Sequence, residues 1–172
     1  MTETKTIRKI FYVWEFEKEE DWLNEMALNG WALKSVGLCK YVFERCEPGE
    51  YIVRIQMHGP DDAYVDFMKE TGAEYVGRMA AWVYFRKKAE EGPFELFSDI
   101  DSRIAHLKKI NLMLMIVCAF NLFWGLYNSF MAARTGVSIG WINLLCAMLL
   151  SYCIGRIHGK EEALKRERRL HE

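Results

Sequence analysis

Two long stretches without a charged residue constrain this chain more than any other feature of its sequence. The first runs from Ile110 to Ala133 and the second from Thr135 to Gly155. Each is long enough to cross a membrane, because about 20 apolar residues in a helix cross a hydrocarbon layer about 30 Å thick. A chain of 172 residues is too short to enclose two such helices in a soluble core. We therefore expect a transmembrane helical hairpin over residues 110–157, with spans at about 110–132 and 137–156.

Basic residues near the ends of these stretches predict the orientation of the hairpin. Nine of them flank its open end, whereas the turn holds only Arg134. Because positive charge is retained on the cytoplasmic side, both termini should be cytoplasmic, with residues 158–172 as a basic tail that can hold anionic lipid. The nine residues are Arg103, Lys108, Lys109, Arg156, Lys160, Lys165, Arg166, Arg168 and Arg169.

Small and polar residues inside the hairpin are predicted to pack its helices together or against another copy. Small residues spaced by four let backbones approach closely, and asparagine amides can hydrogen-bond across an interface. Neither stretch contains Asp, Glu, Lys or His, so an ion or proton relay has little chemistry available. The predicted packing residues are Asn121, Gly125, Ser129, Gly136, Gly140, Asn143, Ala147, Ser151 and Gly155.

Residues 1–90 are predicted to form a cytoplasmic domain of two similar halves. Each half reads as strand, helix, strand, and each helix ends at a glycine, Gly30 or Gly72. The expected strands cover residues 7–16, 34–45, 51–57 and 75–87, and the expected helices cover residues 19–29 and 61–71. At one constant offset between the halves, Trp22, Met26, Gly30 and Phe43 fall on Tyr64, Met68, Gly72 and Phe85.

This order of elements predicts an α+β fold for the domain. A β-α-β-β-α-β order is that of a ferredoxin-like, split βαβ domain, in which two helices cover one face of a four-stranded antiparallel sheet. Residues 91–109 follow as an amphipathic connector helix that leads into the first span.

Alternation along the strands predicts which side chains lie on the uncovered face of that sheet. In the strand 51–57, Val53 and Ile55 belong to the apolar parity, so Arg54 lies on the opposite face. The repeat extends that parity to the other strands, and the residues that it places in the core are Phe11, Val13, Tyr41, Phe43, Val83 and Phe85. The opposite parity predicts an aromatic surface for binding. Its residues are Tyr12, Trp14, Phe16, Arg54, Gln56, His58, Trp82, Tyr84 and Arg86.

Three kinds of occupant remain open for such a face, because contiguous exposed apolar patches usually mark interaction sites. It is covered by a structural element (a second copy, the segment 93–109 or the membrane surface), it binds a small molecule, or it binds a partner protein. Nucleic acid is not expected, because residues 1–109 carry a net charge of −4.

The sequence offers no chemistry that would predict an enzyme. It contains no phosphate-binding loop, no G-x-G-x-x-G, no H-E-x-x-H and no C-x-x-C motif. We therefore expect no catalytic residues, no metal and no cofactor. Cys39, Cys46 and His58 do not have the spacing of a standard zinc site.

Four segments resemble an uncharacterised bacterial family, domain of unknown function 2812. They are Phe11–Phe16, Leu28–Trp31, Tyr41–Glu44 and Phe97–Arg103. The resemblance covers residues 7 to about 110 and implies a membrane hairpin as companion. It also implies a place beside PadR-type transcriptional regulators, and hence a role in membrane-linked regulation or stress sensing.

Together these observations predict a non-enzymatic, multi-pass protein of the bacterial cytoplasmic membrane. Its cytoplasmic domain would bind a partner protein or a small ligand on the aromatic face, with membrane lipid, a second copy and a PadR-type regulator as candidate partners. The alternative is a homo-oligomeric structural or accessory membrane subunit, and a small transporter is a third possibility.

Overall fold

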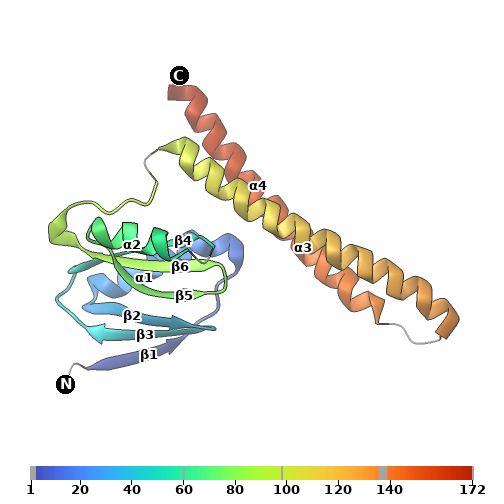
Figure 1. Cartoon of the computed structure of the whole chain (residues 1–172), viewed down its shortest axis with the longest axis horizontal. Coiled ribbons are helices and arrows are strands. Elements are labelled where there is room, and N and C mark those ends of the chain that lie inside the picture. Colours follow the sequence, from blue (N-terminus) through green and yellow to red (C-terminus); the bar gives the residue numbers. More distant parts are fainter. Residues whose placement is uncertain (1–2, 60, 98, 136–138, 172) are drawn as a thin grey trace. The chain divides into compact units, whose positions relative to one another are not determined.

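A computed structural model describes residues 3–59, 61–97, 99–135 and 139–171. The chain forms two compact units, Met1–Leu96 and Phe97–Glu172. The first unit mixes strands and helices and the second consists of two long helices (Figure 1). The predicted α+β class with a helical hairpin is therefore confirmed.

The first half of the N-terminal unit is a three-stranded antiparallel sheet with one helix. Its elements are β1 (Thr4–Arg8), a 3-10 turn η1 (Val13–Glu15), α1 (Phe16–Leu28), β2 (Trp31–Gly37) and β3 (Lys40–Arg45). The strands lie in the order β1-β3-β2. A glycine directly after α1 adopts a positive φ of 79°, which ends the helix as its sequence predicts.

The second half repeats this arrangement. Its elements are β4 (Tyr51–Met57), α2 (Asp62–Glu70), β5 (Glu74–Met79), β6 (Trp82–Lys88) and a 3-10 turn η2 (Ala89–Glu91). The strands lie in the order β4-β6-β5, which corresponds to β1-β3-β2. The register shift in β2, between Leu33 and Ser35, recurs in β5 between Tyr75 and Gly77, which are the equivalent positions of the predicted repeat.

The predicted single four-stranded sheet of the ferredoxin-like order is wrong, because each half has one strand more than expected. The stretches 34–45 and 75–87 each contain a two-residue turn that splits them into a hairpin. Cys39 and Ala80 take positive φ angles of 52° and 53° in these turns. Such turns usually carry Gly, Asn or Asp, so local composition gives no signal for them. The predicted strand 7–16 is also shorter, since β1 ends at Arg8 and α1 begins at Phe16.

Two hydrophobic layers hold this unit together. One lies between the two sheets around α1, where Leu23, Tyr41, Phe43, Val53 and Ile55 are buried. The other lies under α2, on the opposite face of the second sheet (Figure 1). It contains Met68, Ala73, Val83, Phe85 and Phe94.

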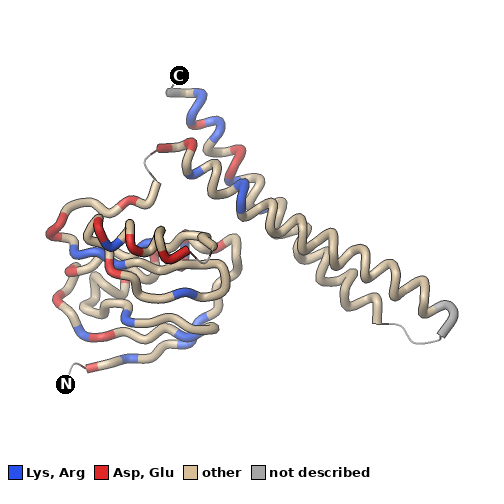
Figure 2. The backbone as a smooth tube through the Cα atoms, in the orientation of Figure 1, with Lys and Arg blue, Asp and Glu red and all other residues tan. Residues whose placement is uncertain are grey.

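The second unit is an antiparallel hairpin of α3 (Ile100–Thr135) and α4 (Gly140–His171). Both helices are long and apolar enough to cross a membrane. Most of their apolar side chains face outward, which separates them from the core helices of a soluble protein. Figure 2 shows that the charged residues of this unit gather where α3 begins and α4 ends.

The two helices approach each other closely at Gly125 and Gly140. A Cβ atom on Gly140 would lie 2.6 Å from the carbonyl oxygen of Gly125 and would also collide with Oγ of Ser129. These predicted packing residues therefore meet inside one hairpin. Nothing lies within 4 Å of such an atom on Gly155, and Gly136 lies outside the described residues.

Candidate functional site

The predicted aromatic surface does not exist as one open face. Directly opposed residues of an antiparallel pair point to the same side of the sheet. The register places Trp82 and Tyr84 beside the buried apolar residues of β4, and Trp82 is only 8% exposed and Tyr84 fully buried. The expected parity of β6 relative to β4 is therefore wrong. The pairs that decide this are Val53 with Arg86, Ile55 with Tyr84 and Met57 with Trp82.

A buried carboxylate joins α1 to both sheets. Glu19 is 6% exposed, and its Oε1 accepts hydrogen bonds from the hydroxyls of Tyr41 (2.7 Å) and Tyr84 (2.6 Å). Burial and the bond to Glu19 raise the pKa of both hydroxyls, so they stay protonated and remain donors. Because Tyr41 belongs to the first sheet and Tyr84 to the second, this contact fixes how the halves pack.

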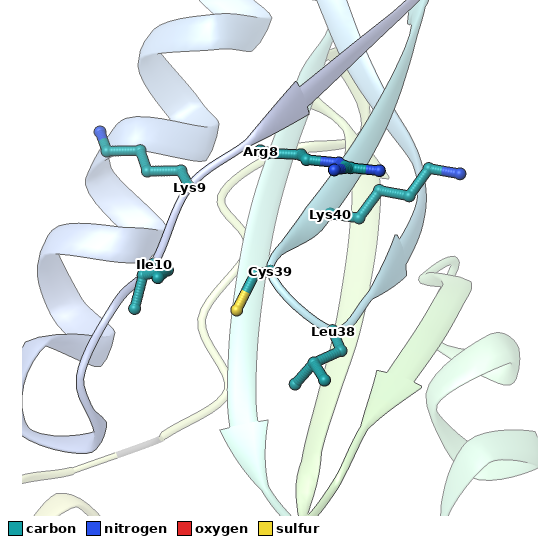
Figure 3. A pocket seen from close by; sticks show the side chains of 6 residues that line it. All are labelled: Arg8, Lys9, Ile10, Leu38, Cys39 and Lys40. Atoms are coloured by element: carbon teal, nitrogen blue, oxygen red, sulfur yellow. The ribbon is translucent and has the colours of Figure 1, made fainter.

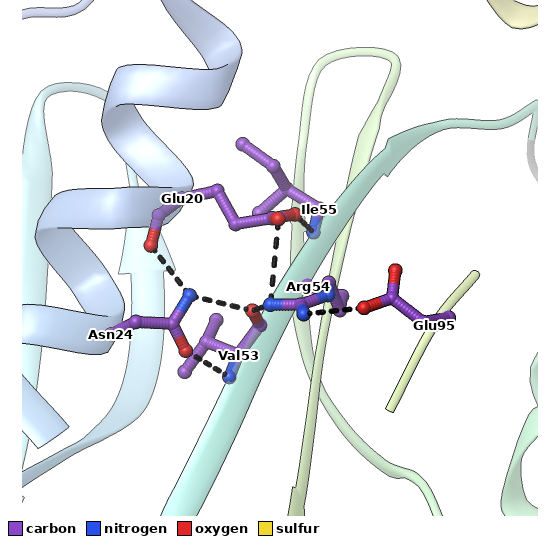
Figure 4. A network of polar contacts seen from close by, with 6 residues as sticks. All are labelled: Glu20, Asn24, Val53, Arg54, Ile55 and Glu95. Atoms are coloured by element: carbon purple, nitrogen blue, oxygen red, sulfur yellow. Dashed lines mark hydrogen bonds and ion pairs between the residues drawn. The ribbon is translucent and has the colours of Figure 1, made fainter. Parts of the chain in front are cut away.

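A second polar cluster binds the outer edge of β4 to α1 (Figure 4). The amide of Asn24 donates to the carbonyl of Val53 and accepts from its N–H, at 3.1 and 2.8 Å. Glu20 accepts the N–H of Ile55 at 2.9 Å and forms an ion pair with Arg54. Burial raises the pKa of Glu20 from 4.5 to about 7. These side chains replace the strand partner that β4 lacks, so Arg54 has a structural contact on this edge.

The other predicted site residues of the second sheet also have partners within the fold. The ring of His58 stacks on Tyr64 at 3.9 Å between centroids, and Gln56 accepts a hydrogen bond from the same tyrosine. Arg86 forms ion pairs with Glu44 at 2.9 Å and Glu74 at 2.7 Å, and so connects the two sheets. All three residues therefore have at least one structural contact within the fold.

The exposed end of the first sheet is the strongest candidate for binding (Figure 3). Here the end of β1 and the turn between β2 and β3 line an open pocket of about 590 Å³. Ile10 and Leu38 are 69% and 87% exposed at its surface. We call these residues the basic–apolar tip: Arg8, Lys9, Ile10, Leu38, Cys39 and Lys40.

The three cations of this tip have like-charged or aromatic neighbours. Arg8 and Lys40 are direct cross-strand neighbours, an arrangement of like charges that costs stability. Lys9 lies over the rings of Phe11 and Trp22, at 4.7 and 4.5 Å from their centroids. Among the residues that the structure describes, no Asp or Glu forms an ion pair with any of the three.

Two of the predicted aromatic residues lie in the segment that follows the tip. Tyr12 is 57% exposed and stacks on Trp14 with 4.6 Å between ring centroids. Phe16, by contrast, is buried and stacks on Trp82. Ile10, Leu38 and the three cations were not predicted from the sequence, because only the pairing of β1 with β3 brings them together.

Three asparagines of the hairpin line one small open pocket, which we call the asparagine notch. Asn121, Asn128 and Asn143 line an open pocket of about 300 Å³ together with Phe120 and Trp124. The amide of Asn121 donates to the carbonyl of Val117 in its own helix, at 2.9 Å. Asn121 and Asn143 were predicted from the sequence as packing residues, but Asn128, which lies two helical turns from Asn121, was not.

The remaining titratable groups show no arrangement for chemistry within the described ranges. No three His, Cys, Asp or Glu side chains are placed there to hold a metal ion. The five cysteines are free thiols, and burial raises the pKa of Cys46, which makes its thiolate less available.

Comparison with known proteins yields a family without an assigned activity. A family model described as "Protein of unknown function (DUF2812)" matches residues 15–119, from the start of the first helix into the first apolar stretch. No curated protein and no solved structure matches the chain. The match confirms the resemblance carried by the sequence motifs.

Proposed function

The chain belongs to the DUF2812 family, and we propose that it is a non-enzymatic membrane protein whose N-terminal domain docks reversibly on anionic lipid. The docking surface is the basic–apolar tip. The observation that carries this proposal is a set of three cations, without a carboxylate partner among the described residues, beside two exposed aliphatic side chains.

The chemistry of the tip fits the boundary between lipid headgroups and acyl chains. Lys and Arg gain about 1 kcal/mol each near an anionic leaflet, so three of them contribute about 3 kcal/mol. Figure 3 shows the side chains of Ile10 and Leu38 on one side of the tip, below those of the three cations, and these two apolar side chains would enter the acyl boundary. These favourable free energies are small enough for the binding to be reversible. Because the domain is attached to membrane-spanning helices, its effective concentration at the membrane surface is high.

The charge of the rest of the domain supports one orientation on the surface. Residues 1–109 carry a net charge of −4 although the tip contributes three positive charges. The remaining surface is therefore acidic and would be repelled by anionic headgroups. The like-charged pair Arg8 and Lys40 costs stability in the free domain, and an anion between them would relieve that cost.

Docking of this kind would connect the state of the membrane to what the domain presents to the cytoplasm. The regulatory role, with a PadR-type regulator as the cytoplasmic partner, rests on the family resemblance. In that role, the fraction of docked domain would follow the anionic lipid content of the leaflet.

The proposal is tested with the full-length protein in nanodiscs with and without phosphatidylglycerol. Hydrogen exchange of the amides in residues 8–12 and 37–41 should slow when anionic lipid is present. Arg8→Gln combined with Lys40→Gln should abolish the difference without loss of folding, because it removes a like-charge pair. Leu38→Ser should weaken it.

A matched control comes from an exposed lysine elsewhere on the domain. Lys69 forms a surface ion pair with Asp66, so Lys69→Gln should leave the lipid-dependent protection unchanged. Equal exchange of the tip in neutral and anionic nanodiscs would contradict the proposed docking.

A further inference from the structure

We infer that the asparagine notch of the hairpin is the interface for a second copy of this chain. The inference is independent of lipid docking by the tip, since it concerns only α3 and α4. It rests on the amides of Asn128 and Asn143, which find no hydrogen-bond partner among the residues that the structure describes.

The notch lies at hydrocarbon depth. Asn121 is near the middle of the first uncharged stretch, and Asn128 is about 10 Å further along the helix at 1.5 Å per residue. Asn143 lies inside the second stretch, beside the close contact of Gly125 with Gly140. Lipid tails cannot hydrogen-bond to an amide, so a polar side chain at this depth is driven to find a protein partner.

The described residues of the hairpin supply no such partner for Asn128 and Asn143. The amide nitrogen of Asn121 already donates to the carbonyl of Val117, and the seam between the helices is filled by Leu144 against Gly125 and by Ser129 against Gly140. The amides of Asn128 and Asn143 remain in the notch, half-buried and open to its outer side.

A second copy is the occupant that fits this chemistry best. An asparagine amide is both donor and acceptor, so the same surface on two copies is complementary to itself around a two-fold axis. Phe120 is 62% exposed at the rim of the notch and would pack against the partner's helices. Neither uncharged stretch offers an acid, a lysine or a histidine that would mark the notch as an ion pathway.

The test measures association of the full-length protein in lipid vesicles. Copies labelled at the C-terminus with donor or acceptor dye are diluted with increasing lipid, and energy transfer reports the dimer. Asn128→Leu and Asn143→Leu should each weaken association about tenfold, and the double variant should weaken it further. Leucine favours membrane insertion, so these variants keep the spans intact.

Two comparison variants separate the notch from general effects on the hairpin. Asn121→Leu should have a smaller effect, because the amide of Asn121 already bonds within its own helix. Leu149→Ala removes an exposed apolar side chain outside the notch and should leave dimer affinity unchanged. The inference is supported if dimer affinity falls most in Asn128→Leu and Asn143→Leu, less in Asn121→Leu and not at all in Leu149→Ala.

Three results would overturn the inference. One is a wild-type protein that shows no energy transfer at any lipid dilution. Another is association that both asparagine variants leave unchanged. The third is native mass spectrometry that shows a monomer carrying a small molecule which Asn143→Leu releases, since the notch would then be a ligand site.

Discussion

The contact of Glu19 with two tyrosines makes a quantitative prediction about what holds the halves of the domain together. Tyr84→Phe removes one buried hydroxyl that donates to the carboxylate at 2.6 Å and leaves the ring in place. A hydrogen bond to a charged group contributes about 1.5–3 kcal/mol, so the variant should lose about that much free energy of unfolding. For a domain of this size, the midpoint of thermal unfolding should fall by roughly 6–20 °C.

The double variant tests whether the two tyrosines act as one unit. Tyr41→Phe alone should cost about as much as Tyr84→Phe, because its hydroxyl is equally buried and donates at 2.7 Å. Together, the changes leave Glu19 buried without either donor. The combined loss should therefore exceed the sum of the single losses by about 1 kcal/mol or more. Replacing Glu19 by Leu in the double variant should recover part of the stability, since no buried carboxylate remains.

These changes are measured by thermal and guanidinium unfolding of the full-length protein in nanodiscs, followed by near-ultraviolet circular dichroism. Tyr75→Phe is the matched control. Its hydroxyl has no hydrogen bond among the described residues, and its side chain is 41% exposed, so the midpoint should not change. Single variants within about 0.5 kcal/mol of wild type, or strictly additive losses, would refute the reasoning.

Three further predictions follow from local features. Burial raises the pKa of Glu20 from 4.5 to about 7 in the folded domain, so the folded state holds this proton more tightly than the unfolded state. The free energy of unfolding should therefore fall by up to about 3 kcal/mol as the pH rises from 4.5 to above 7. Urea titrations at several pH values measure this dependence, and Glu20→Gln should flatten it. Gly140→Ala should force the helices of the hairpin apart and lower its free energy of unfolding in detergent by about 1–3 kcal/mol. Gly155→Ala should have no such effect, because nothing lies within 4 Å of the added methyl group. Equal effects of the two variants would mean that the close contact does not stabilise the hairpin. Reporter fusions should place both termini in the cytoplasm and the turn near Arg134 outside it, and a reporter that is active in the periplasm from the C-terminus would reverse the predicted topology.

The alternating patterns of the sequence predicted most of the core residues of the strands but not how the strands pair. Tyr41, Phe43, Val53, Ile55, Val83 and Phe85 were expected to be buried and are buried, whereas Phe11 and Val13, expected in the same core, are only half-buried. The sequence did not show that Val83 and Phe85 bury against α2 whereas Val53 and Ile55 bury toward α1. The alternation of apolar and polar residues shows which side of a strand is buried, but it does not show what covers that side. A shift of one residue in the pairing of two strands reverses which side chains face a given helix.

The candidate binding residues also show that alternation along a strand does not predict which face of a sheet another element covers. Tyr12 and Trp14 were predicted as surface aromatics and stack on one another, with Tyr12 exposed. Trp82 and Tyr84 were grouped with them because they are aromatic and alternate correctly, yet both are buried by α1 and the first sheet. Burial by a second sheet is a contact between segments far apart in the chain, and no local pattern encodes it.

Features that depend on neighbours along the chain were determined by the sequence itself. The two helices long enough to span a membrane, the glycine that ends each short helix and the constant offset between the halves could all be read directly. Helix length, capping and repetition are set within a few residues.

The tertiary structure alone decided which distant residues meet. It brought Arg8 opposite Lys40, enclosed Glu19 between two tyrosines of different sheets and placed Asn143 beside Asn121. Each of these contacts joins segments whose pairing depends on the packing of the whole unit, because a backbone hydrogen bond or a buried polar contact forms only where both partners are brought into register.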